Sequence, residues 1–237
     1  MGVSLKSLAF TLKQGGYMRW LLRTIGITRF ALAAATASTA HGQTIFSATS
    51  GVVNLGGPGF GTLTQTINQS GLSAFYTANV TNFDSYIASN PMHARFLGNE
   101  WFSNSGITAA TVTYDFGSVR SLDRFALWNE DASGIGLLNI LGSLDGITFS
   151  SILAGLTPPD NLVSADYPAT VYSFATSSAR YFRMEMSRCP QTSGSFEGCA
   201  IGEVAFRSAD VVPEPSTYAL LATGIVSLAL FARRRRA

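Results

Sequence analysis

The sequence predicts an all-β fold for residues 43–209, in the form of an antiparallel β-sandwich. Over this stretch, short runs rich in branched and aromatic residues alternate with turn-forming residues, as strands alternate with their connections. The candidate strands are residues 111–117, 124–129, 137–143, 171–174, 180–186 and 202–207. Apart from a short candidate helix at 84–88, no helical stripe and no internal repeat interrupts them. Many strands without helices are typical of a sandwich.

The run 180–186 illustrates the strand pattern. Its side chains alternate in character, with Tyr181, Arg183 and Glu185 on one face and Phe182, Met184 and Met186 on the other. A strand with one face in water and the other in a core requires this alternation. Further back in the chain, Asp145-Gly146 predicts a tight turn between a strand that ends near Leu144 and one that starts at Ile147.

Residues 1–42 are predicted to be a signal peptide for export through the Sec machinery. Three arginines up to Arg29 precede an Ala-rich apolar stretch at 30–40, and Ala40-His41-Gly42 has the small-x-small pattern of a cleavage site. The mature chain would then start at Gln43. Cleavage after Ala40, initiation at Met18 and an uncleaved amphipathic helix are the alternatives.

The last residues combine three features. Pro213 and Pro215 favour an exposed extended segment. Residues 216–232 form an apolar run that would span about 25 Å as a helix, slightly less than a membrane core. The cluster Arg233, Arg234, Arg235 and Arg236 would stay in the cytoplasm and fix the orientation. An ordinary C-terminal anchor with a Pro-rich stalk is one interpretation.

The order Pro213-Glu214-Pro215, apolar run and arginine cluster resembles the tripartite PEP-CTERM sorting signal, here over residues 210–237. The resemblance implies a Gram-negative bacterium that makes an extracellular polysaccharide. It also implies an exosortase that cuts near Pro-Glu-Pro in the inner membrane. The expected destination is the cell surface or the extracellular matrix.

The net charge of the mature region differs from that of the whole chain. The formal charge of +2 reflects 16 basic and 14 acidic residues, but nine of the basic residues lie in the two targeting segments. Residues 43–212 keep seven arginines, no lysine and 13 carboxylates, which gives 7 − 13 = −6. This charge excludes nucleic acid as an expected partner.

Cys189 and Cys199 are the only two cysteines. In an exported protein they predict a disulfide, which closes a small loop rich in Gly, Ser and Thr and contributes about 2–3 kcal/mol by chain entropy. Free thiols or a metal pair are the alternatives, although no histidine lies nearby in the sequence.

Five short motifs resemble the discoidin or F5/8 type C domain, within a stretch of roughly residues 70–207. They are residues 113–117, 125–128, 143–149, 179–183 and 201–204. The resemblance implies a galactose-binding-like jelly roll, in which loops at one end of the sandwich bind glycans and a structural Ca²⁺ is often present. It does not imply a particular ligand.

The candidate ligand-binding residues are aromatic side chains that could stack on a sugar and polar residues at a strand end: Trp101, Trp128, Tyr86, Asn129, Glu130 and Asp131. Core packing of the aromatic residues and a solvated turn at 129–131 are the alternatives. For Ca²⁺, the resemblance implies Glu203 together with Asn82 and Asp84. Salt bridges to Arg95 or Arg207 are the plainer alternative for these acids.

Catalysis has little support in the residues. His93 is the only histidine after Gly42, and no phosphate-binding glycine loop is present, which removes most triads and zinc sites. A carboxylate pair could hydrolyse a glycoside, but any acidic protein offers such pairs. We therefore expect a non-catalytic surface or matrix protein that binds carbohydrate, with the producer's exopolysaccharide as the candidate ligand. A structural coat or biofilm protein that binds proteins or itself and a glycoside hydrolase are the alternatives.

Overall fold

The computed structural model describes residues 43–95, 98–209, 222–225 and 227. The chain divides into two units, one of residues 41–212 and one of residues 1–40 together with 213–237. In the latter, residues 222–225 and 227 are helical. No helix within the described residues has the length and apolarity needed to cross a membrane. The predicted signal peptide, the Pro-Glu-Pro motif and the four terminal arginines lie outside the described residues.

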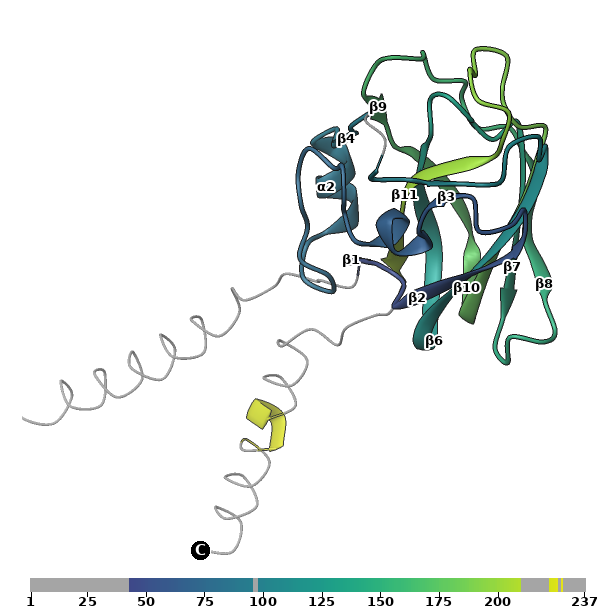
Figure 1. The fold of residues 1–237 in the computed structure, drawn as a ribbon. Coiled ribbons are helices and arrows are strands. Elements are labelled where there is room, and N and C mark those ends of the chain that lie inside the picture. The colour runs from purple at the N-terminus through teal and green to yellow at the C-terminus, as the bar shows by residue number, and fades with distance from the viewer. Residues whose placement is uncertain (1–42, 96–97, 210–221, 226, 228–237) are drawn as a thin grey trace, which may run out of the picture. The chain divides into compact units, whose positions relative to one another are not determined.

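Residues 41–212 are built mainly of strands, with two short helices near the start (Figure 1). In chain order the elements are β1 (Ile45–Phe46), β2 (Ser50–Leu55), β3 (Phe60–Gly61), the 3₁₀-helix η1 (Leu63–Ile67), α2 (Phe83–Ala88), β4 (Met92–His93), β5 (Trp101–Phe102), β6 (Ala109–Asn129), β7 (Leu137–Ser143), β8 (Ser150–Leu156), β9 (Tyr167–Pro168), β10 (Thr170–Ser187) and β11 (Ala200–Ser208).

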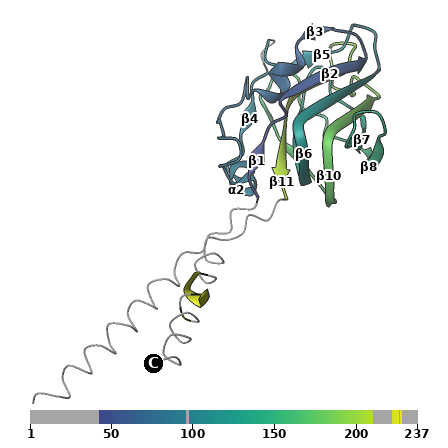
Figure 2. The same ribbon diagram turned by 90° about the horizontal axis from the view of Figure 1, so that it is seen from below.

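Two long strands, β6 and β10, belong to both halves of the sandwich. The first half of β6 pairs with β2 and with residues 181–187 of β10, and the second half pairs with β11 and with residues 170–173 of β10. The ladder is irregular between these halves, where Gly117 adopts a φ of 76° that favours glycine. All pairings in the strand order β3-β5-β11-β6-β10-β7-β8 are antiparallel (Figure 2). The predicted antiparallel β-sandwich is confirmed.

The main core lies between the two halves and is dominated by phenylalanine rings. Phe206 packs edge-on against Phe116 and Phe182, with ring centroids 4.8 and 4.9 Å apart. A second core covers the outer face of β6 and β11, where Trp128 and Ala205 meet the segment that contains α2. Because β11 is covered on both faces, every one of its residues is buried.

An ion-pair cluster fixes α2 to the sheet. The Arg207 guanidinium, 4% exposed, donates to the Asp123 carboxylate at 2.6 and 2.8 Å and to Asp84 Oδ2 at 2.9 Å. Arg124 donates to the other Asp84 oxygen at 2.8 Å. The buried positive charge of Arg207 is therefore balanced by the carboxylates of Asp123 and Asp84.

The first and last strands of the described residues 43–209, β1 and β11, lie beside each other. The Ser208 N–H donates to the Thr44 carbonyl at 2.9 Å, and Ile45 in β1 pairs with Arg207 in β11. At the other end of β11, Ala200 pairs with Phe102 and donates to the Ser133 carbonyl. The strand β11 thus runs from the end of the sandwich that carries Phe102 and Ser133 to the opposite end, which carries Thr44 and Ile45.

Candidate functional site: a pocket at the loop end of the sandwich

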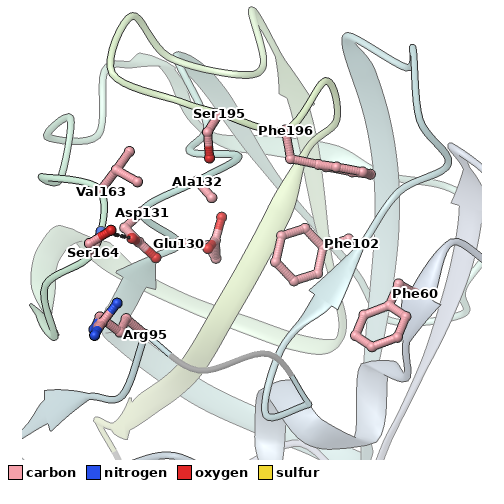
Figure 3. A pocket seen from close by; sticks show the side chains of 10 residues that line it. All are labelled: Phe60, Arg95, Phe102, Glu130, Asp131, Ala132, Val163, Ser164, Ser195 and Phe196. Carbon is pink, nitrogen blue, oxygen red and sulfur yellow. Dashed lines mark hydrogen bonds between the residues drawn. The ribbon is translucent and has the colours of Figure 1, made fainter.

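An open pocket with a volume of about 480 Å³ lies where β6 ends and β11 begins. Its walls differ in character (Figure 3). Three phenylalanine rings, of Phe60, Phe102 and Phe196, form one side. On the other side lie the charged side chains of Arg95 and Asp131, with Glu130 between the two walls. A pocket of this size with an apolar surface and a few convergent polar groups is typical of small-ligand sites.

The aromatic wall combines one buried ring with two exposed ones. Phe60 in β3 pairs with Phe102 in β5, and their ring centroids are 6.3 Å apart. Phe102 also meets Phe196 edge-on, with centroids 5.6 Å apart and planes at 86°. Phe102 is buried, whereas Phe60 is 53% exposed and Phe196 is 36% exposed. The two exposed rings offer apolar surface that a ligand can cover.

Gly59 allows the close approach of β3 to β5 that builds this wall. Its φ is 60°, and a Cβ added there would lie 1.7 Å from the Phe102 carbonyl oxygen. We expect Gly59→Ala to lower the free energy of unfolding by about 2–4 kcal/mol, because backbone strain adds to a clash with backbone. Urea unfolding measures this change.

Gly155→Ala is the matched control for that variant. Gly155 has a φ of 70°, but nothing lies within 4 Å of an added Cβ. This control variant should lose only the free energy of unfolding that corresponds to backbone strain, about 1 kcal/mol. Equal losses of stability in the two variants would contradict the close approach of Gly59 to Phe102.

The loop that carries Phe196 is held on both sides. The disulfide Cys189–Cys199 closes it, with a Cα–Cα distance of 5.0 Å, which confirms the predicted pairing. The N–H groups of Ser195 and Phe196 both donate to the Ala132 carbonyl, at 2.9 and 3.1 Å. Across the loop, Gly106 N–H donates to the carbonyl of residue 197 at 2.7 Å. The position of Phe196 is therefore fixed before any ligand arrives.

The polar wall is formed by Arg95 and by the loop that follows β6, which carries Asp131 and also Glu130, the residue that lies between the two walls. The Ser133 N–H donates to Glu130 Oε2, and the Ser164 N–H donates to Asp131 Oδ2 at 2.8 Å. Burial, and after it the neighbouring Asp131, raise the pKa of Glu130 to about 8. At neutral pH this wall therefore carries a protonated carboxyl beside Asp131. The role of both acids in binding remains a prediction.

Behind the pocket lies a buried group of titratable side chains. The His93 ring stacks on Tyr167 with centroids 5.1 Å apart, and His93 Nδ1 is 3.8 Å from Glu100 Oε1. Burial lowers the pKa of His93 to about 4 and raises the pKa of Glu100 to about 7. Between these values both side chains are mainly uncharged, so their contact is not an ion pair.

Stability should fall as the pH rises from 6.5 to 8. Glu100 and Glu130 have pKa values of about 7 and 8 in the folded chain, compared with the ordinary glutamate value of 4.5 in the unfolded chain. The folded state therefore binds more protons than the unfolded state in this pH range. The lowered pKa of His93 makes stability rise with pH, but only between about pH 4 and 6.5, where the folded state binds fewer protons than the unfolded state. We expect a loss on the order of 1–2 kcal/mol from Glu130, measured by urea unfolding at each pH. Glu130→Gln should make the slope shallower, while Glu100 and Glu203, whose pKa values are also raised by burial, keep part of it. An unchanged slope would contradict this assignment.

Four of the six predicted ligand-binding residues are buried away from the pocket. Trp101 and Trp128 are 1% and 0% exposed, and their indole N–H groups donate to the carbonyls of Pro58 and Pro91. Tyr86 is 6% exposed and donates to the Ala74 carbonyl at 2.6 Å. Asn129, 1% exposed, connects loops through Gln191 and residues 135 and 159. Neighbouring segments cover these four side chains, so they offer no surface to a ligand in this structure, and their contact with a sugar stays a prediction.

The predicted calcium ligands do not come together. The Asn82 side-chain oxygen accepts from Ser85 N–H as the N-cap of α2, and both Asp84 oxygens accept from arginines. Glu203 is fully buried elsewhere, with Oε2 accepting from Gln69 N–H at 3.1 Å and Oε1 without a partner. Burial raises the pKa of Glu203 well above its usual range. Ca²⁺ takes six to eight oxygen ligands, so this predicted set does not fit it.

More generally, no cluster of three or more acidic, histidine or cysteine side chains within the described residues is arranged to hold a metal.

Sequence reasoning missed the aromatic wall and Arg95. A signal was present for two of the three rings, because Phe60 stands in the glycine-rich run GGPGFG and Phe196 stands in the Gly- and Ser-rich disulfide loop. A large ring among turn residues has little core to pack into. Such rings indicate surface function more directly than a tryptophan within an apolar strand.

Comparisons with known proteins identify the C-terminal segment. Residues 211–236 match the family model described as the PEP-CTERM protein-sorting motif, which confirms the resemblance found in the sequence. The motif marks an exported protein directed to the cell surface. None of the curated proteins compared with the chain matches it.

Several solved structures are similar to the chain. One is chitosan-binding module 1 from a chitosanase/glucanase of Paenibacillus sp. IK-5, with 15% identity and a TM-score of 0.42 over 71% of this chain and 98% of that one. Another is CBM32 of AlyQ in complex with 4,5-unsaturated mannuronic acid, with 16% identity and a TM-score of 0.40 over 68% and 96% of the chains. A CBM32 module from Clostridium perfringens in complex with GalNAc-β-1,3-galactose has 15% identity and a TM-score of 0.37 over 45% and 73%. Similarity at this level assigns no ligand to the present chain.

Proposed function

We propose that this exported chain is a non-catalytic binding protein whose sandwich holds a carbohydrate in the loop-end pocket. The pocket itself is the observation that carries the proposal. It places the exposed rings of Phe60 and Phe196 opposite the charged groups of Arg95 and Asp131.

The two walls suit the two kinds of surface on a sugar. The C–H face of a pyranose is apolar and packs on aromatic rings, while its hydroxyl groups both donate and accept hydrogen bonds. The protonated Glu130 can donate to a hydroxyl group, and the Asp131 carboxylate can accept from one. Burial of most of these polar groups makes their hydrogen bonds more selective, since an unmatched ligand leaves them unsatisfied.

The position of the pocket suits a protein attached through its C-terminus. The nine-residue strand β11 starts beside the pocket and ends at Ser208, where the chain continues toward the sorting motif. At about 3.3 Å per residue, the strand places its end at Ser208 about 30 Å from the pocket. A domain held at its C-terminal end would therefore present the pocket on the far side.

The sorting motif suggests how the chain reaches that position. We propose export through the Sec machinery, a membrane intermediate held by the C-terminal apolar run, and cleavage near Pro213-Glu214-Pro215 by an exosortase of a Gram-negative bacterium. After cleavage the domain would stay at the cell surface or enter the extracellular matrix, where the producer's exopolysaccharide is the nearest candidate ligand.

A glycan array tests the proposed function. The full chain, kept in a sugar-free detergent, should bind a subset of immobilised glycans, and Phe60→Ala should reduce that signal at least about tenfold. Phe75→Ala is the matched control, because Phe75 is 76% exposed and does not line the pocket. Incubation with the bound glycan should release no reducing sugar. Binding to no glycan, or equal effects of the two variants, would refute the proposal.

A second candidate function, self-association in a coat or biofilm, has one observation in its favour. Among the described residues, the strand β2 pairs only with β6. It contains no charged residue and exposes Val52 and Leu55 at 60% and 57%. Uncharged sheet edges of this kind can pair with another chain. Sedimentation that depends on concentration in the native chain, but not in Val52→Lys, would favour this function.

A further inference from the structure

The disulfide loop separates the pocket from a second hollow. This hollow has a volume of about 500 Å³ and lies against Thr108, Pro190 and Glu197. Ser195 and Phe196 line both the pocket and the second hollow. The two cavities are therefore neighbours that share a wall only one loop thick.

The shared wall is rigid enough to serve as a binding surface. Hydrogen bonds from Ser195 and Phe196 N–H to Ala132 hold it from the pocket side, and Ser133 Oγ donates to the Phe196 carbonyl at 2.8 Å. On the side of the second hollow, the Gly106 N–H donates to the carbonyl of Glu197, the residue after Phe196. A Cβ on Gly198 would lie 2.8 Å from the Phe196 ring, so glycine at this position lets the ring lie back against the loop. A fixed ring loses little conformational entropy when it binds.

We propose that the two cavities bind neighbouring units of one uncharged polysaccharide chain, which crosses the Phe196 ridge. This inference rests on the proposed function and adds the class of ligand, a polymer segment of at least two pyranose units rather than a single terminal sugar. Phe196 would contact the units on both sides. Glu197 would accept hydrogen bonds from the unit in the second hollow.

The charges around the cavities favour an uncharged polymer. Among the described residues that line either cavity, Arg95 is the one basic side chain, whereas Asp131 and Glu197 are acidic and Glu130 is a protonated carboxyl. Residues 43–212 as a whole have a formal net charge of −6, from seven arginines and 13 acidic residues. A polymer with a carboxylate on each unit would be repelled by this surface, while hydroxyl groups can donate to it.

The dependence of affinity on chain length tests the inference. The full chain in a sugar-free detergent is titrated calorimetrically with glucose, galactose and mannose, and with neutral oligomers of each containing two to six units. For the sugar that binds, the tetramer should bind about tenfold or more tightly than the monomer, a change that corresponds to 1.4 kcal/mol. The same oligomer with a carboxylate on each unit should bind more weakly.

Two variants separate the cavities. Glu197→Ala should remove most of the gain from added units while leaving the affinity for the monomer within about twofold, and Phe196→Ala should weaken the tetramer about tenfold. Phe75→Ala again serves as the exposed aromatic control. Equal affinity for monomer and tetramer, with no effect of Glu197→Ala, would overturn the inference and leave the single pocket standing. Absence of binding by sugars of any length would overturn both.

Discussion

Replacing both Cys189 and Cys199 by serine should cause the largest loss of glycan affinity of any change outside the pocket. The disulfide spans ten positions, and its chain-entropy contribution to the free energy of unfolding is about 2–3 kcal/mol. It also holds the loop on which Ser195 and Phe196 line the pocket. We expect urea unfolding to show that loss of stability, and titration to show a fall in affinity of about tenfold or more.

Reduction of the native chain is the matched control for the serine variant. Reduction removes the same bond without a change of sequence, so the two preparations should behave alike. Unchanged glycan affinity in a folded, reduced chain would contradict the role of the disulfide in positioning Phe196.

Trp128→Ala should cause the largest loss of stability. The Trp128 side chain is fully buried in the outer core and donates to the Pro91 carbonyl at 2.9 Å. Truncation of such a side chain costs about 3–5 kcal/mol, measured by urea unfolding, and leaves that carbonyl without its donor. Phe75→Ala, at a ring 76% exposed, should change stability by less than about 0.5 kcal/mol.

Trp128→Phe distinguishes packing from direct sugar contact. This variant keeps most of the apolar volume, so the chain should still fold and bind glycans with native affinity. A folded Trp128→Phe variant that no longer bound glycan would restore the interpretation of Trp128 as a stacking residue.

The strands were predictable because their evidence is local. The alternating run 180–186 predicts part of β10. The run 137–143 predicts β7 with the bounds that the structure shows. Asp145 accepts from the N–H groups of residues 147 and 148, as the predicted turn requires, although β8 starts only at Ser150. The runs 111–117 and 124–129 proved to be one strand, β6, because a glycine bend continues the ladder instead of ending it.

The site was less predictable because distant segments decide its exposure. Trp128 stands in an apolar strand whose outer face could have met either water or protein, and the segment that covers it comes from residues 72–93. The pocket wall likewise joins Phe60, Phe102 and Phe196, of which the first and last are 196 − 60 = 136 positions apart in the sequence. The position of Glu130 and Asp131 in a loop at the end of a strand was predictable, because polar residues there often begin a binding loop. Their role in binding stays a prediction.

The structure of the chain in complex with the glycan that binds most tightly tests the central claim most directly. We expect sugar units to lie against Phe60 and Phe196, with hydroxyl groups within hydrogen-bond distance of Asp131. A glycan bound elsewhere would contradict the account, for instance in the hydroxyl-lined hollow beside Ser143 and Thr148 at the β7–β8 turn.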